Sequence, residues 1–415
     1  MPATNGWRWR HLLDSPHRLG FFLAMLVLGV SGLWWAGVQL ARSGFVPAVP
    51  MAVSPSLVHA ALMTFGFFPL FFCGFLFTAG PRWLHVRAPT TRELMPALLA
   101  QGAGWLIWLV GSHVHVLLAV AGLALAAAGL LRAAVRFWRL IHASSDTDRV
   151  HPTVIAGALA LGCACIASTA VALALGADML ARLFVLTGLW GCVAVVFVTA
   201  GHRMIPFFTA PPGTVLERGG DWWQLALLVG ISLFEAVCVW LADPLAGVGA
   251  WHVARGVIEM ATGSVLLWGA VAWTFARSLR NRLLRMLHTG MLWIALGLLL
   301  QGVTGVLAWR LGSPVLPLAP LHAFAMGGLG SVMLAMITRV SAGHAGIPVA
   351  VDHVVWALFW LLQLATALRV AATVPGTPAQ ALLTAAALVW AGVAIAWALR
   401  YGSGYGRPPA TTRRR

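Results

Sequence analysis

Two histidines with the same local pattern are the residues best suited to chemistry. His59 opens the stretch His-Ala-Ala-Leu-Met, and His322 opens the stretch His-Ala-Phe-Ala-Met. Each stands at the start of an apolar run long enough to cross a bilayer, where an imidazole is costly unless it pairs, lines a cavity or binds something. We therefore expect the two imidazoles to share one ligand between helices, and haem iron or copper is the first candidate.

The residues that follow these histidines suit a packed environment. Met63 and Met326 lie four residues further on, on the same predicted helix face, and we interpret them as packing residues rather than ligands. Glycines one or two turns later let helices, or a flat macrocycle, approach closely. The alternative for both histidines is an interfacial position, in which they hydrogen-bond to headgroups or water.

A second set of candidates pairs a histidine with an arginine at the end of two other apolar runs. His202 and Arg203 lie in Gly-His-Arg-Met-Ile-Pro, and Arg339 precedes His344 in Thr-Arg-Val-Ser-Ala-Gly-His. Histidine could hold a metal such as copper, and arginine could hold haem propionates or another anion. The alternative is that these residues only anchor helix ends at the membrane surface.

Few acidic residues fall within apolar segments. Glu259 follows Arg255 by four residues on a predicted helix, so these two side chains can neutralise each other. Glu235 has no partner nearby in the sequence, and it either faces the bundle in a protonated or hydrogen-bonded form or serves a proton path. No chain of acids crosses the predicted membrane region, which argues against a proton pump.

The composition predicts the fold class. The chain has 415 residues, of which 60% are hydrophobic and 9% charged, whereas a soluble domain carries about 25% charged residues. We therefore predict an all-α, polytopic membrane helix bundle that forms a single domain over residues 1–415, with a basic tail at 407–415. The five cysteines all fall in apolar segments and imply no disulfide framework.

The distribution of arginine predicts the topology. With a need of about 20 apolar residues per span, we expect about twelve transmembrane helices, at 19–41, 57–80, 94–111, 114–137, 153–176, 180–201, 222–242, 251–275, 284–309, 319–340, 354–373 and 379–399. All 27 basic residues are arginine, and the side opposite the N-terminus keeps only Arg42, Arg182, Arg255, Arg310 and Arg369. The positive-inside rule then places both termini in the cytoplasm, with the chain in a bacterial inner membrane. The net charge of +16 therefore reflects topology and implies no nucleic-acid partner.

Three even-numbered spans end in related sequences. Residues 78–82 read Thr-Ala-Gly-Pro-Arg, residues 199–203 read Thr-Ala-Gly-His-Arg, and residues 338–339 read Thr-Arg. Together with the two His-Ala-x-x-Met starts, this pattern hints at an internal duplication. Short matches in a biased composition also arise by chance, so no assignment rests on the repeat.

Three segments of the chain resemble the NnrS family of bacterial membrane proteins. They are 57–83, which begins Leu-Val-His-Ala-Ala-Leu-Met, 201–209, which reads Gly-His-Arg-Met-Ile-Pro-Phe-Phe-Thr, and 322–348, which begins His-Ala-Phe-Ala-Met-Gly-Gly-Leu-Gly. The resemblance implies a twelve-helix protein of nitric oxide metabolism and denitrification that carries haem and copper. The chain departs from the family in one place: Ala61 and Leu62 stand where many members have a second histidine and a glutamate.

These observations favour a haem-binding inner-membrane protein that handles nitric oxide or protects against nitrosative stress, with unknown catalytic residues. No Cys-x-x-Cys-His motif is present, so the haem would be non-covalent haem b. Histidines on the second and tenth spans are analogous to low-spin haem ligands of haem–copper oxidases, although the adjacent histidine pair that such oxidases use for copper has no counterpart. An enzyme of this kind would be a haem-dependent oxidoreductase acting on nitric oxide. The alternatives are a cofactor-free transporter or permease and a non-catalytic partner of another membrane enzyme.

Overall fold

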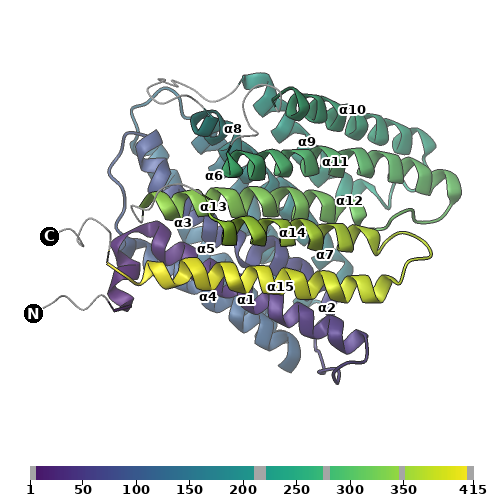
Figure 1. Ribbon diagram of the computed structural model, residues 1–415, viewed down its shortest axis with the longest axis horizontal. Helices are drawn as coiled ribbons and strands as arrows, with labels where there is room; N and C mark the ends of the chain where they lie inside the picture. The colour runs from purple at the N-terminus through teal and green to yellow at the C-terminus, as the bar shows by residue number, and fades with distance from the viewer. Residues whose placement is uncertain (1–5, 210–220, 274–280, 345–350, 409–415) are drawn as a thin grey trace, which may run out of the picture.

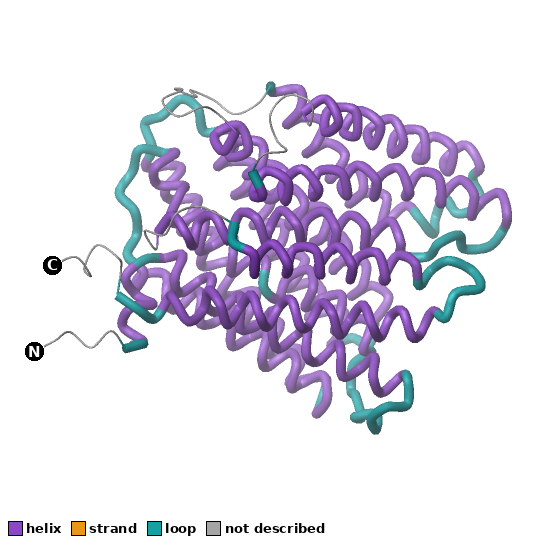
Figure 2. Tube along the Cα trace, in the orientation of Figure 1, coloured by secondary structure: helices purple, strands orange, loops and turns teal. Residues whose placement is uncertain are grey.

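The protein is a bundle of long helices. The computed structural model describes residues 6–209, 221–273, 281–344 and 351–408, and every regular element in these ranges is helical (Figures 1 and 2). Eleven of the described helical segments are long and apolar enough to cross a membrane. They are α1 (Pro16–Arg42), α2–α3 (Pro55–Ala61 and Phe68–Trp83), α4 (Thr91–Val114), α5 (Val116–Ala143), α6 (Val150–Ala174), α7–α8 (Asp178–Gly188 and Val195–Thr209), α9 (Trp222–Leu241), α11 (Arg282–Leu311), α12–α13 (Ala319–His322 and Gly330–His344), α14 (His353–Ala371) and α15 (Ala379–Tyr405).

Helix α10 (Gly249–Trp273) is the twelfth long helix. It has 25 residues and lies along α11 (Figure 1). Its apolar sequence is interrupted by Arg255 and Glu259. The predicted membrane helix bundle is confirmed, and the expected number of about twelve spans agrees with the eleven segments together with α10. The observed helices extend several of the predicted spans, as in α15, which continues to Tyr405 rather than ending at 399.

Polar caps explain where several helices begin. Thr90 and Glu93 form a reciprocal capping box at the start of α4, in which the Thr90 backbone N–H donates to the Glu93 carboxylate at 2.8 Å. Asp352 accepts a hydrogen bond from the backbone of Val355 at the start of α14. Such caps satisfy N–H groups that have no partner within the helix. They extend α4 beyond the apolar residues that the sequence prediction had counted.

Three spans share an irregularity in their first half. A π-helical segment connects α2 to α3 (Leu62–Gly66), α7 to α8 (Leu189–Ala194) and α12 to α13 (Ala323–Leu329). The three spans concerned are the second, sixth and tenth, so the feature recurs every four helices, in the same spans that carry the related sequence ends. They are also the most buried, at 89%, 78% and 78%, against 33% to 56% for the rest of the eleven. These spans form the core of the bundle, and π segments are frequent at functional sites.

The central spans contact one another through small residues and aromatic rings. A Cβ atom added to Gly188 would lie only 1.9 Å from Cζ of Phe65, so the sixth span approaches the second where it has no side chain. The rings of Trp190 and Phe324 join the sixth span to the tenth, with centroids 4.4 Å apart. Close approach through glycine is the usual way in which membrane helices pack, because dispersion contacts replace the hydrophobic effect there.

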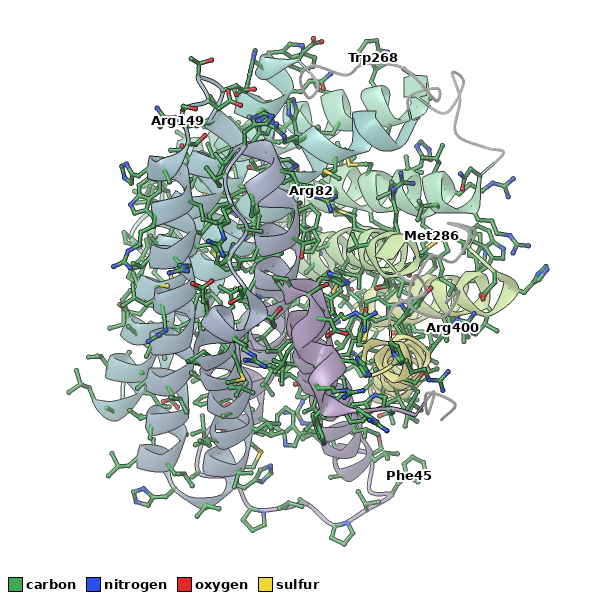
Figure 3. The ribbon with its side chains drawn as sticks, turned by 90° about the vertical axis from the view of Figure 1, so that its left-hand side faces the viewer. Phe45, Arg82, Arg149, Trp268, Met286 and Arg400 are labelled. Carbon is green, nitrogen blue, oxygen red and sulfur yellow. The ribbon has the colours of Figure 1, made fainter. Side chains whose placement is uncertain are left out.

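Both described ends of the chain lie at the same end of the bundle. Arg18, in the first turn of α1, donates hydrogen bonds to the backbone carbonyls of Tyr405 at 2.9 Å and Arg407 at 2.7 Å, just at and after the end of α15. We call this the terminal end and the other the far end. Figure 3 looks onto the terminal end, where the labelled arginines Arg82, Arg149 and Arg400 project from helix termini and loops.

Candidate metal centre

The structure brings His59 and His322 together at the far end of the bundle. Each histidine lies in the last turn of a short helix, α2 or α12, before the π segment of its span. Their imidazole rings have centroids 6.5 Å apart and planes within 7° of parallel. The second and tenth spans, which are far apart in the sequence, therefore meet at two identical side chains.

The separation of the two rings suits a metal between them. A metal–imidazole bond is about 2 Å long and the nitrogen lies about 1 Å from the ring centre, so two imidazoles on opposite sides of one metal have centroids about 6 Å apart. The observed 6.5 Å is close to that value. Two ligands suffice only for a group that fills the remaining coordination positions itself, as the porphyrin nitrogens of haem do.

The hydrogen bonds of the two rings leave nitrogen atoms available. Nδ1 of His322 lies 2.8 Å from the carbonyl oxygen of Leu318. Because a carbonyl only accepts, this nitrogen carries the proton, and Nε2 keeps the lone pair that a metal requires. Nδ1 of His59 is buried and has no hydrogen-bond partner among the described residues. A nitrogen that is shielded from water and without a partner does not fit the interfacial alternative.

Trp35 and two arginines surround the histidine pair. The Trp35 ring, from α1, stacks on His59 with centroids 3.9 Å apart and planes 19° from parallel. The guanidinium of Arg42 lies 5.4 Å from the centre of the Trp35 ring. Arg369, on α14, acts electrostatically on both imidazoles, and Arg42 acts on His59. Within the described part of the chain, neither arginine has a carboxylate partner.

The sequence analysis missed these two arginines as site residues. Arg42 and Arg369 were identified only as members of the minority on the side opposite the N-terminus. That position could have identified them as site residues, because arginine is uncommon on the side opposite the positively charged loops and is more often kept there for a specific interaction. The same side of the membrane also held His59 and His322 in the predicted topology.

The arginines that the sequence suggested for anions lie elsewhere. Arg203 and Arg339 are at the terminal end, and Arg339 is seventeen residues after His322 along one span, about 25 Å at 1.5 Å per residue. The guanidinium of Arg203 packs over the Trp83 ring at 5.2 Å and keeps Nη1 buried with no hydrogen-bond partner. Neither side chain is brought to the pair of His59 and His322.

His202 is paired with a histidine that the sequence did not single out. Nδ1 of His202 lies 2.9 Å from Nε2 of His151, in the first turn of α6, and Nε2 of His202 lies 3.1 Å from the carbonyl oxygen of Asp221. Since that carbonyl must accept, His202 is protonated at Nε2, and His151 donates to its Nδ1. The side chain of His344, at the end of α13, lies outside the described residues, so its expected pairing with His202 is not described.

The side chains that most often hold metal ions do not cluster in the described part of the chain. No group of three or more histidine, cysteine, aspartate or glutamate side chains there could hold a metal ion. The five cysteines are free and buried, as expected from their apolar segments. The pair of His59 and His322 offers two imidazole donors, which is the number that a haem requires from the protein.

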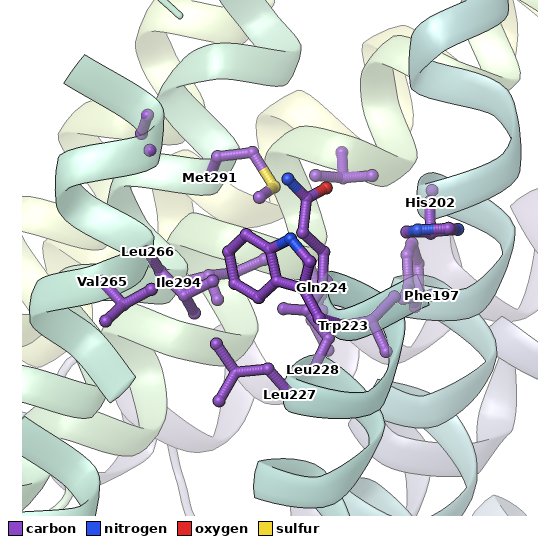
Figure 4. Close-up of a pocket in the computed structure, with 16 residues that line it drawn as sticks. Phe197, His202, Trp223, Gln224, Leu227, Leu228, Val265, Leu266, Met291 and Ile294 are labelled. Carbon is purple, nitrogen blue, oxygen red and sulfur yellow. The ribbon is translucent and has the colours of Figure 1, made fainter. Parts of the chain in front are cut away.

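One cavity lies apart from the histidine pair. It has a volume of about 390 Å³ and is enclosed by α8, α9, α10, α11 and α13. Figure 4 shows that its labelled lining is mainly apolar, with Gln224 and the edge of His202 as polar exceptions. Cavities of this kind accept apolar ligands, and neither His59 nor His322 is among the residues that line this one.

Comparisons with known proteins agree with this architecture. A family model described as NnrS protein matches residues 11–408. The chain is also similar to a solved structure titled "Cryo-EM structure of a heme-copper terminal oxidase dimer provides insights into its catalytic mechanism", with a TM-score of 0.56 and 13% identity, covering 95% of this chain and 84% of that one. At that identity the likeness concerns the fold alone. No curated protein matches the sequence.

Proposed function

Because the chain belongs to the NnrS family, we propose that it binds one haem b between His59 and His322 and acts in nitric oxide metabolism or in protection against nitrosative stress. One observation carries the proposal: two parallel imidazoles from separate spans lie 6.5 Å apart, and one of them is fixed in the tautomer that a metal ligand needs. The fold that this chain shares with a haem–copper oxidase adds support. We place the protein in the bacterial inner membrane on the basis of its arginine distribution.

Each residue around the pair has a part in this proposal. His59 and His322 would hold the haem iron, and the Leu318 carbonyl would fix the orientation of the His322 ring. Trp35 would keep water from one face of His59. Arg42 and Arg369 would offer positive charge to the haem propionates, because guanidinium groups bind carboxylates through paired hydrogen bonds. The haem itself supplies reversible one-electron chemistry.

Nitric oxide can reach a site of this kind, although it would have to displace one of the two histidines to bind the iron itself. It is small and uncharged and dissolves in the apolar bilayer, so it reaches a metal within a helix bundle without a polar channel. The second and tenth spans begin at the far end, where His59 and His322 are half-buried. We propose that a membrane electron donor supplies the electrons that conversion of nitric oxide would require.

Copper is a separate proposal that rests on the family resemblance. We propose His202 with His344 as its ligands, as the sequence suggested. Both ring nitrogens of His202 already have hydrogen-bond partners in the structure, so a metal there would have to displace His151 or the Asp221 carbonyl.

An absorption spectrum tests the proposed function. The protein is purified in detergent, and spectra are recorded before and after reduction with dithionite, with haem quantified as its pyridine complex. We expect a Soret band that shifts on reduction and about one haem b per chain. A folded protein that remains colourless when expressed with ample haem would refute the proposal and favour a cofactor-free transporter.

A further inference from the structure

Three charged side chains meet between α9 and α10. Arg255 donates from its Nη2 to the Glu235 carboxylate at 2.8 Å and from its Nε to the Glu259 carboxylate at 2.7 Å. Both glutamates are 1% exposed. The sequence predicted the contact between Arg255 and Glu259 within α10. The contact between Arg255 and Glu235 joins α10 to α9. We call the cluster of Glu235, Glu259 and Arg255 the carboxyl triad.

The charges of the carboxyl triad do not balance. Two carboxylates face a single guanidinium, so the cluster would carry a net negative charge if both acids were ionised. Among the described residues, the only other titratable group that acts on it is the buried thiol of Cys238, which brings no cation. A buried charge without a partner costs several kcal/mol even after relaxation.

The helices packed against α9 and α10 carry charged side chains, but none of them is among the groups that act on Arg255 or Glu259: Asp178 and Arg182 on α7, Arg203 on α8, and Arg282, Arg285 and Arg310 on α11. α11 meets α10 through backbone and apolar contacts, with Gly256 against Val306 and Gly302 against Met260. The π segment of the sixth span meets α9 where Gly191 faces Ala236, the neighbour of Glu235. These contacts bring no cation to the triad other than Arg255.

A hydrogen bond between the two acids accounts for the imbalance. One guanidinium contacts both carboxyl groups, that of Glu235 at 2.8 Å and that of Glu259 at 2.7 Å, so the two acids lie next to each other. Two ionised carboxylates cannot hydrogen-bond to each other, because each can only accept. Oε1 of Glu235 is buried and has no donor in reach among the described residues. A proton shared by the two acids would supply the missing donor and remove the excess charge.

We propose that Glu235, Glu259 and Arg255 form a site that binds one exchangeable proton, shared by the two carboxyl groups and held in place by the guanidinium. Its position connects it to the core of the bundle: Ala236 packs on Gly191, and the adjoining Trp190 contacts Phe324, two residues after His322. The proton is therefore placed where it can balance a change of charge in the central spans. This inference does not require haem to be bound.

Infrared spectroscopy of the whole protein tests the proton site. A protonated carboxyl has a C=O stretching band that a carboxylate lacks, and the protein is measured near neutral pH in a detergent without ester groups. We expect one such band, shifted to lower frequency after exchange into D2O. Glu235→Gln and Glu259→Gln are each expected to abolish it, because each leaves one carboxylate paired with one guanidinium.

A control and a second variant keep this test decisive. Asp243→Asn removes an exposed acid just after α9 and is expected to leave the band unchanged. Arg255→Gln removes the cation, so both acids take up a proton and the band gains intensity. The proposal is overturned if the parent protein has no such band, if the band survives in either glutamine variant, or if it does not shift in D2O.

Discussion

Leu318 accepts two hydrogen bonds from His322, one from the backbone N–H at 3.1 Å and one from ring Nδ1 at 2.8 Å. Leu318 itself has a φ of +65°, a left-handed conformation that a branched side chain adopts only at a cost of about 1–2 kcal/mol. The backbone strain is therefore located at Leu318, the residue whose carbonyl fixes the ring of His322, a candidate metal ligand. Strained backbone is often retained where it orients a functional group.

We expect His59→Ala and His322→Ala each to abolish or strongly shift the Soret band. Each variant removes one of two axial ligands, and the remaining imidazole lies in an apolar bundle without its partner. The double variant should be no worse than either single one, because the two residues act on one group. His252→Ala is the matched control, since His252 is half-buried and, among the described residues, is seen to hydrogen-bond to the Ala246 carbonyl and to stack on the Trp309 ring. Parent-like haem content in both single variants would exclude the assignment and direct attention to His17, His202, His288 and His344.

Arg369 should tune the potential of the bound haem. Arg369→Gln removes a positive charge that acts on both imidazoles. The oxidised form of the haem, which carries one more positive charge, is then stabilised relative to the reduced form, and the midpoint potential falls by roughly tens of millivolts. Arg369→Lys should retain most of the parent potential. Arg339→Gln, at the terminal end, serves as the control in a spectroelectrochemical titration. An unchanged potential in Arg369→Gln would mean that this arginine does not face the haem.

The sequence predicted the helix bundle and the two candidate ligands because both depend on local pattern. Hydropathy over one span and the repeated His-Ala-x-x-Met start can be read without knowing which helices touch. Leu318 lies four residues before His322, and its carbonyl reaches the His322 ring from a left-handed backbone conformation. Leucine rarely adopts that conformation, so nothing in the sequence indicated it. The π segments likewise follow ordinary apolar sequences, so the sequence alone did not reveal them.

Partners contributed by other helices could not be predicted in the same way. The i,i+4 rule identified Arg255 with Glu259, but the contact to Glu235 depends on how α9 packs against α10. Similarity of local pattern suggested His344 as the companion of His202, and the side chain of His344 lies outside the described residues. The packing of α6 against α8 places His151 beside His202, which the local pattern did not suggest. Tertiary packing, rather than propensity, decides these pairings.

Gly188 should tolerate no side chain. A Cβ atom at this position would lie 1.9 Å from Cζ of Phe65, in the core between the second and sixth spans. We expect Gly188→Ala to destabilise the protein by about 1–3 kcal/mol, as overpacking of a core does. Gly157→Ala is the control, since nothing lies within 4 Å of its added Cβ, and it should be neutral or slightly stabilising. Thermal unfolding in detergent compares the two, and equal midpoints would show that Phe65 moves aside without cost.

His202 and His344 should matter for copper and not for the first haem. If they hold copper, His202→Ala and His344→Ala lower the copper content per chain while the Soret band stays at its parent position. His151→Ala provides a comparison, because it removes the hydrogen-bond partner of His202 and leaves both proposed ligands in place. Metal analysis by mass spectrometry gives the ratios. Equal copper in the parent and in both alanine variants at 202 and 344 would leave these residues with a structural role only.

The membrane orientation can be tested with reporter fusions. Arg18 bonds to the carbonyls of Tyr405 and Arg407, so both described ends of the chain lie at one end of the bundle. The excess of arginine at that end predicts that it faces the cytoplasm. Fusions after Arg415 and within 82–92 should therefore report cytoplasm, and a fusion within 43–53, between α1 and α2, should report the periplasm. An exported reporter after Arg415 would mean either that the bundle is inserted the other way round or that the number of membrane-crossing helices is odd. The fusion within 43–53 separates the two, because only an inverted bundle would place it in the cytoplasm.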